Sequence, residues 1–137
     1  MPNRRRAYID ENGGHRDGAW YLDSGATNHI SNDFNNLNIS SEYKGNDQLA
    51  VGNGAKLKIV SVDHSLLSTL DLHILSHIKL NHILYVSEIT KNLISISKLL
   101  HDNDVFIEFN KTFCVVKDKR KGNVLLKGMA KDRLYKL

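Results

Sequence analysis

The chain has 137 residues, of which 41% are hydrophobic and 25% charged, and it carries a single cysteine. This length fits one domain with a core of its own, and the composition is ordinary for a globular protein. No apolar run approaches the roughly 20 residues of a membrane-spanning helix, and Cys114 alone excludes a disulfide framework or a thiolate zinc site. The basic start leads into polar residues, unlike a signal peptide. We therefore expect a soluble, intracellular and cytoplasmic protein without a membrane partner.

The net charge of +4 comes from 19 Lys and Arg against 15 Asp and Glu, with basic clusters at Arg4–Arg6 and Lys117–Lys121. Basic clusters can bind nucleic acid by releasing counterions from phosphates. Neither cluster carries interleaved aromatic residues or a known nucleic-acid motif, which favours a solvated tail and a hairpin turn. We therefore expect no nucleic-acid partner for this segment and keep a basic nucleic-acid-binding module as a distant alternative.

The first part of the chain divides into a leader and a strand. Residues 1–18 are rich in Arg and Gly and poor in large apolar residues, which predicts a flexible basic leader. Trp20–Leu22 is a short β-prone run that ends in turn-forming residues. Residues 31–46 are rich in Asn and Ser and are predicted to form mainly loop.

Gln48 to Val62 has the pattern of a β-hairpin. Leu49 and Val51 come before Gly52-Asn53-Gly54, and Leu57 and Ile59 come after it. An Asn-Gly pair supplies the positive φ angles that a tight hairpin turn requires.

Leu70 to Val86 alternates with a two-residue period, which predicts a long strand with Leu80, Leu84 and Val86 on one face. On such a strand His73 and His77 lie roughly 13 Å apart, at about 3.3 Å per residue. That distance is too large for the two rings to share an ion. We therefore predict no metal site, and no coenzyme motif is present.

The last third of the chain returns to strands after one short helix. Leu93, Ile96 and Leu99 recur at helical spacing before Asp102, which predicts a helix near 93–101. Residues 105–109 and 113–116 read as strands, and further strands reach the end of the chain. The predicted fold class is all-β with one helix.

The turn Asp23-Ser24-Gly25 holds the chain's strongest candidate for chemistry. Peptide hydrolysis without a metal or a covalent intermediate needs one group to activate water and one to protonate the leaving amine. Two carboxylates a few ångströms apart fill both roles by sharing one proton. The chain carries one such triplet, so a complete site needs two copies. Ser24 can brace the loop through its hydroxyl, and Gly25 leaves room for a carboxylate.

An ordinary turn is the alternative interpretation of these three residues, because Asp, Ser and Gly are all turn formers. The pattern arises by chance in roughly one chain in twenty of this length. The apolar run before Asp23 and the small Ala26 after the triplet strengthen the catalytic interpretation.

Several segments, in order, resemble the protease segment of Ty1/copia-type retrotransposon Pol polyproteins. The matching segments are Trp20–Ile30, Val51–Gly54, Asn92–Leu100, Val105–Phe109, Cys114–Asp118 and Leu134–Leu137. The likeness covers roughly residues 19–137 and is far more specific than one triplet. It implies a retropepsin-like fold, a small closed β-barrel that pairs into a two-fold homodimer.

The resemblance also implies roles for individual residues. Asp23 is the catalytic acid, one from each subunit, braced by Ser24 and Gly25. The implied substrate-binding residues are Ala26, Thr27 and Asn28 in the cleft and Gly52, Asn53 and Gly54 in a flap over the bound peptide. Residues 19–110 form the barrel, and residues 111–137 form a C-terminal β extension toward the pre-integrase region.

The predicted function is therefore an aspartic endopeptidase that processes a Gag-Pol-like polypeptide as a homodimer, with no cofactor. A non-catalytic relic with the same barrel is the alternative, because the chain begins shortly before Asp23 and looks like a fragment of an element. The sequence leaves open the cleavage preference, the role of His29, and whether residues 111–137 pack on the barrel.

Overall fold

The computed structural model describes residues 18–33, 38–42, 48–50, 56–70 and 77–137. These residues form strands and one short helix, α1 (Ile96–Asp102), which confirms the predicted fold class. The strands are β1 (Trp20–Asp23), β2 (Ile30–Ser31), β3 (Asn38–Glu42), β4 (Gln48–Ala50), β5 (Lys56–Lys58), β6 (Ser61–Ser68), β7 (His77–Tyr85), β8 (Asn92–Ser95), β9 (Val105–Phe109), β10 (Phe113–Asp118), β11 (Val124–Lys131) and β12 (Leu134–Lys136).

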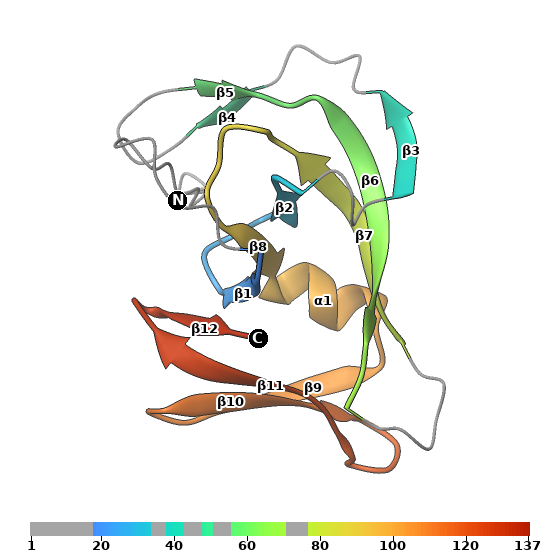
Figure 1. The fold of residues 1–137 in the computed structure, drawn as a ribbon. Helices are drawn as coiled ribbons and strands as arrows, with labels where there is room; N and C mark the ends of the chain where they lie inside the picture. The colour runs from blue at the N-terminus through green and yellow to red at the C-terminus, as the bar shows by residue number, and fades with distance from the viewer. Residues whose placement is uncertain (1–17, 34–37, 43–47, 51–55, 71–76) are drawn as a thin grey trace.

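Ten of these strands form one curled sheet, a half-barrel in which α1 lies inside the curl (Figure 1). The strand order is β3-β6-β7-β2-β8-β1-β12-β11-β10-β9, and β4 and β5 form a separate two-stranded sheet. Strands β1 and β8 are parallel neighbours at the centre, and β2 is parallel to β7. The sheet therefore places the start of the described chain in the middle of the molecule.

The central strands are buried on both faces. Tyr21 and Leu93 point to one side, where they pack with Leu134, while Leu22 and Ile94 point to the other side and join the main core. A strand covered on both faces needs apolar residues at consecutive positions. This explains why β1 and β8 read as short continuous apolar runs in the sequence.

The helix begins three residues later than the predicted range of 93–101. Leu93 and Ile94 belong to β8 and pair with Tyr21 and Leu22 of β1. Pairing with a buried central strand outweighs the helical spacing of these residues. The helix then starts after Ser95, whose Oγ accepts a hydrogen bond from the Lys98 backbone N–H at 3.3 Å as an N-cap. No helix in the described ranges is long and apolar enough to cross a bilayer.

The long alternating strand predicted over residues 70–86 is confirmed in part. Strand β7 covers its second half, and residues 71–76, which include His73, lie outside the described residues. The alternation shifts at a bulge, because Asp63 pairs with Ile83 whereas Ser65 pairs with Leu80. His82 takes a positive φ of 54° at this point. The extra residue turns Ile83 into the core, so Leu80 and Leu84 do not share one face as predicted.

The predicted hairpin is present in its two strands, β4 and β5, which pair through Leu49 and Leu57. Both leucines are buried in an apolar cluster with Ile30, Ile59, Val86 and Ile89. The predicted turn, Gly52-Asn53-Gly54, lies outside the described residues. Val62 belongs instead to β6, where it pairs with β3 and β7.

Strands β9 to β12 form antiparallel hairpins, with turns at Asn110, at Gly122 (φ 74°) and at Asp132-Arg133 (φ 51° and 67°). The last strand, β12, pairs with β1, with Lys136 opposite Tyr21. Residues 111–137 therefore share one sheet with the central strands, a question that the sequence left open.

Candidate active site

Asp23 is the last residue of β1, and its side chain is only 1% exposed. Its Oδ1 accepts a hydrogen bond from the Gly25 backbone N–H at 2.8 Å, and the turn is closed by a longer bond of 3.4 Å from the Ala26 N–H to the Asp23 carbonyl. Ser24, at the tip of this turn, is exposed. The strand thus delivers a carboxylate into a tight turn and fixes its orientation with a backbone amide.

The predicted cleft residues follow directly in the chain. Ala26 is buried, whereas Thr27 and Asn28 are half-buried, and the Asn28 side-chain amide donates to Thr27 Oγ1 at 3.2 Å. The structure therefore gathers residues 23–28 in one turn. The predicted flap residues Gly52, Asn53 and Gly54 lie outside the described residues, so their placement near this turn stays a prediction.

A hollow of about 290 Å³ lies beside the exposed side of the Asp23 turn. Its lining is mainly apolar, with one cation, and comprises Leu22, Ser24, Ile96, Phe109, Arg133 and Tyr135. The rings of Phe109 and Tyr135 contact each other with centroids 5.2 Å apart. This surface combines the tip of the turn with the start of α1 and the C-terminal strands.

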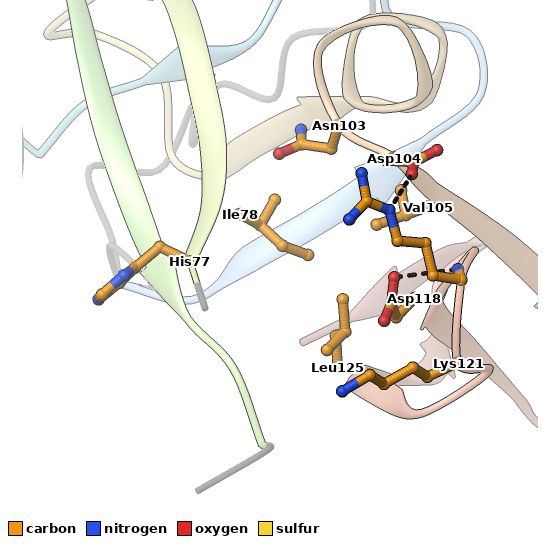
Figure 2. A pocket seen from close by; sticks show the side chains of 9 residues that line it. His77, Ile78, Asn103, Asp104, Val105, Asp118, Lys121 and Leu125 are labelled. Carbon is orange, nitrogen blue, oxygen red and sulfur yellow. Dashed lines mark hydrogen bonds and ion pairs between the residues drawn. The ribbon is translucent and has the colours of Figure 1, made fainter. Parts of the chain in front are cut away.

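A second hollow, of about 320 Å³, lies at the opposite end of α1 and shares no residue with the Asp23 turn. Figure 2 shows His77 and Ile78 on one side of it and Lys121 and Leu125 on the other. Arg120 crosses its rim, with its Nε 3.6 Å from Asp104 and its backbone N–H donating to Asp118 at 3.2 Å. Arg120, Asp104 and Asp118 thus contact one another at the rim of this hollow.

Asn92 is a buried residue opposite Trp20, at the start of β1, and the sequence indicates it only as part of a longer motif. Its Oδ1 accepts hydrogen bonds from the Ser31 hydroxyl at 2.9 Å and the Asn32 N–H at 3.0 Å, and its amide donates to the Gly18 carbonyl at 3.4 Å. Asn92 therefore ties β8 to β2 and to the entry of β1. The signal in the sequence is one amide directly before the apolar run Leu93-Ile94.

His29 is the second residue whose role the sequence did not reveal. Its side chain is fully buried, and its Nδ1 accepts a hydrogen bond from the Ser95 backbone N–H at 3.0 Å. Burial, together with the smaller effect of the nearby positive charge of Lys98, lowers the pKa of His29 to about 4. The imidazole is therefore neutral at physiological pH.

Comparison with known proteins shows the family to which the chain belongs. Residues 20–105 match the model of the family described as Pol polyprotein, beta-barrel domain. This match covers more than half of the chain and includes the Asp23 turn, Asn92 and α1. The chain belongs to this family.

Two relatives of this Pol β-barrel domain come from Arabidopsis thaliana. The retrovirus-related Pol polyprotein from transposon RE2 is 39% identical over 134 residues, which cover 98% of this chain and 9% of the relative. The corresponding polyprotein from transposon RE1 is 43% identical over 116 residues, which cover 85% of this chain and 8% of the relative. The chain thus spans less than a tenth of either polyprotein. The predicted resemblance to retrotransposon Pol polyproteins is confirmed, and no solved structure matches the chain.

Proposed function

We propose that this Pol β-barrel domain is an aspartic endopeptidase whose active site forms between two copies of the chain. The observation that carries the proposal is the Asp23 turn, in which a buried carboxylate is oriented by the Gly25 N–H next to an exposed Ser24. One chain supplies one such carboxylate, and the reaction needs two. In this proposal the second copy approaches at Ser24, the exposed tip of the turn.

The chemistry follows from two carboxylates that share one proton. The ionised carboxylate takes a proton from water while the protonated one donates to the carbonyl oxygen of the peptide. The resulting tetrahedral intermediate collapses with cleavage of the C–N bond, and the amine leaves after gaining a proton. In each copy the Gly25 N–H holds Asp23 Oδ1, so the orientation of the carboxylate is set before the substrate arrives.

The substrate in this proposal is a polypeptide of the Gag-Pol type, consistent with the relatives' names as Pol polyproteins. Thr27 and Asn28 contact it in the cleft, and the flap expected from the sequence is the β4–β5 hairpin, whose turn at Gly52, Asn53 and Gly54 lies outside the described residues. The apolar cluster around Leu49 and Leu57 anchors the base of that hairpin. We expect the highest activity at acidic pH, where the pair retains its shared proton.

The test compares the wild-type domain with Asp23→Asn on a fused Gag-like polypeptide. We expect Asp23→Asn to abolish cleavage while the circular dichroism spectrum stays the same. Asp132→Asn is the matched control, because Asp132 is exposed in the β11–β12 turn, and it should cleave like the wild type. Well below the dimer dissociation constant, halving the protein concentration should lower the rate about fourfold, because the active species contains two chains.

Added Asp23→Asn protein should also inhibit the wild type by forming mixed pairs. Equal cleavage by wild type and Asp23→Asn would refute the proposal. A folded wild-type domain that cleaves nothing at any concentration would support the non-catalytic relic instead.

One observation favours a second candidate function, binding of single-stranded nucleic acid. Residues 105–137 contain nine Lys or Arg and three Asp or Glu, a net charge of +6, whereas residues 18–104 contain six and nine, a net charge of −3. Lysines and aromatic rings from neighbouring strands meet on one face of this region. Lys117 Nζ lies 5.9 Å from the centroid of the Phe106 ring, and Lys127 Nζ lies 4.7 Å from that of Phe113.

The basic cluster Lys117–Lys121 contains no aromatic residue in the sequence, because the rings come from strands that pair with the strands of the lysines. The test is fluorescence anisotropy with a single-stranded RNA at increasing salt. Binding should weaken steeply with salt, and Lys127→Glu with Lys131→Glu should reduce it, whereas Lys58→Glu on β5 should not. An affinity that does not change with salt concentration, or that all three substitutions change equally, would refute this candidate.

A further inference from the structure

His29 joins two parts of the candidate site that are far apart in the chain. It lies six residues after Asp23, and its carbonyl accepts a hydrogen bond from the Leu84 N–H at 2.8 Å. Its ring accepts from Ser95, which is the register partner of Asp23 on β8 and the N-cap of α1. The loop that carries Asp23 is thus held at its far end by β7 and by the start of the helix.

The hydrogen bond from Ser95 determines the state of the ring. A backbone N–H can only donate, so Nδ1 of His29 must be unprotonated and the ring proton must be on Nε2. Nε2 is buried and has no hydrogen-bond partner among the described residues. The contact with Ser95 is therefore the polar contact by which this ring is held, and it exists only in the neutral ring.

Strands β2 and β8 are paired through Ile30 and Leu93, two residues before Ser95. The Ser95 N–H lies beyond this pair of residues. Its hydrogen-bond acceptor is the His29 side chain and not a backbone carbonyl of β2. This arrangement fixes the end of β8 at the point where it pairs with Asp23 and turns into α1.

The charged groups around the ring come from two elements. Lys98 and Asp102 face it from α1, and His82 faces it from the bulge of β7. Burial of the ring is the largest cause that disfavours a charge on His29, Lys98 and His82 add to it, and Asp102 opposes it. On β8 the ring meets the backbone amide of Ser95, which is also a donor. A proton on Nδ1 would therefore place two donors against each other in a buried site.

We propose that His29 is a positioning residue, whose neutral imidazole fastens the Asp23 turn to the start of α1 and whose protonation releases it. The structural part of this proposal stands on the Ser95 contact alone, and the effect on cleavage rests on the proposed peptidase function. Because an aspartic dyad needs acid and this fastening needs a neutral ring, His29 sets the lower pH limit of activity.

The direction of the pH effect follows from the two states of the ring. The pKa of His29 is about 4 in the folded chain and 6.5 in an unfolded one, so between these values the unfolded chain binds more protons. The contribution of His29 to the free energy of unfolding is fully present above the pKa of the unfolded chain, and it falls as the pH drops from 6.5 toward 4. Below the folded value this contribution does not change further.

The first experiment measures the ring and the fold without any substrate. Histidine-labelled NMR should show His29 as the Nε2–H tautomer, titrating near pH 4, and the thermal midpoint should drop between pH 6.5 and 4. In His29→Asn the side-chain Oδ1 replaces Nδ1 as the acceptor and does not titrate, so the drop should become clearly smaller. His29→Leu removes the acceptor and should lower the midpoint at all pH values, and His77→Asn, at an exposed histidine, should match the wild type.

The second experiment measures cleavage against pH. The acidic limb of the profile should move to lower pH in His29→Asn, which should recover cleavage that is lost in His29→Leu. Titration of His29 near its ordinary value, or the same pH dependence of stability in wild type and His29→Asn, would overturn the proposal. If no variant cleaves while the first experiment gives the expected result, the peptidase function fails and the structural role of His29 stands.

Discussion

The region around the Asp23 turn and the C-terminal hairpins are held together by different kinds of contact. All eight buried polar residues found in the described part of the chain lie between Asp23 and Ser95, and residues 105–137 contain none of them. Two of the contacts in the first region join residues more than 60 positions apart, Ser31 with Asn92 and His29 with Ser95. The C-terminal region instead uses tight turns and an apolar inner face that packs on the main core.

This difference predicts where substitutions should lower the free energy of unfolding most. A buried polar group must keep its hydrogen bonds, since an unmatched one costs far more than the bond itself contributes. The Asp23 region depends on several such groups at once, so single substitutions there should have large effects. The C-terminal region should tolerate the loss of a polar side chain because water can replace it.

Asn92→Ala should give the largest effect on stability. The substitution leaves the Ser31 hydroxyl and the Asn32 N–H without their acceptor in a buried site. We expect a loss of about 3 kcal/mol in the free energy of unfolding, measured by urea denaturation with an unchanged m-value.

Asn110→Ala is the matched substitution in the C-terminal region. Like Asn92 Oδ1, Asn110 Oδ1 is a shared acceptor, here for the backbone N–H groups of Thr112 and Phe113, but it lies in an exposed turn. Water can satisfy these donors after the substitution, so we expect a loss of about 1 kcal/mol. Equal losses for Asn110→Ala and Asn92→Ala would show that burial does not separate the two regions.

Arg133→Gly should give the smallest effect, and in the opposite direction. Arg133 has a φ of 67° in the β11–β12 turn, a conformation that costs a non-glycine residue roughly 1–2 kcal/mol. Glycine removes this cost but adds freedom to the unfolded chain, so we expect a net gain of about 0.5 kcal/mol. Arg133→Lys keeps both the charge and the unfavourable φ and should not change the unfolding midpoint. A loss of stability in Arg133→Gly would show that the side chain contributes more than its backbone costs.

Local patterns were sufficient to predict much of the fold. The apolar run before Asp23, the paired strands on either side of residues 52–54 and the strands predicted at 105–109 and 113–116 all depend on neighbours in the sequence, and the structure contains them. The predicted start of the helix was wrong because Leu93 and Ile94 pair with Tyr21 and Leu22 of β1, a strand far earlier in the sequence. The shift of alternation in β7 was missed because a bulge at His82 depends on its pairing with β6.

The candidate site shows the same limit. The turn of Asp23, Ser24 and Gly25 could be predicted because its three residues are consecutive and their turn chemistry is local. The role of His29 could not, because it depends on one hydrogen bond to a residue 66 positions away and on the tautomer which that bond imposes. A single histidine before an apolar residue gives no sign of either.

The pairing of β12 with β1 has a consequence for the order of events during synthesis. Strand β1, which presents Asp23, is the first strand of the described residues, yet one of its two neighbours, β12, is the last one. Until Leu134–Lys136 emerge, one edge of β1 has no neighbour, and Tyr21 lacks the cover that Leu134 gives it. The pairing of the strand that presents Asp23 is therefore completed only after β12 has been synthesised.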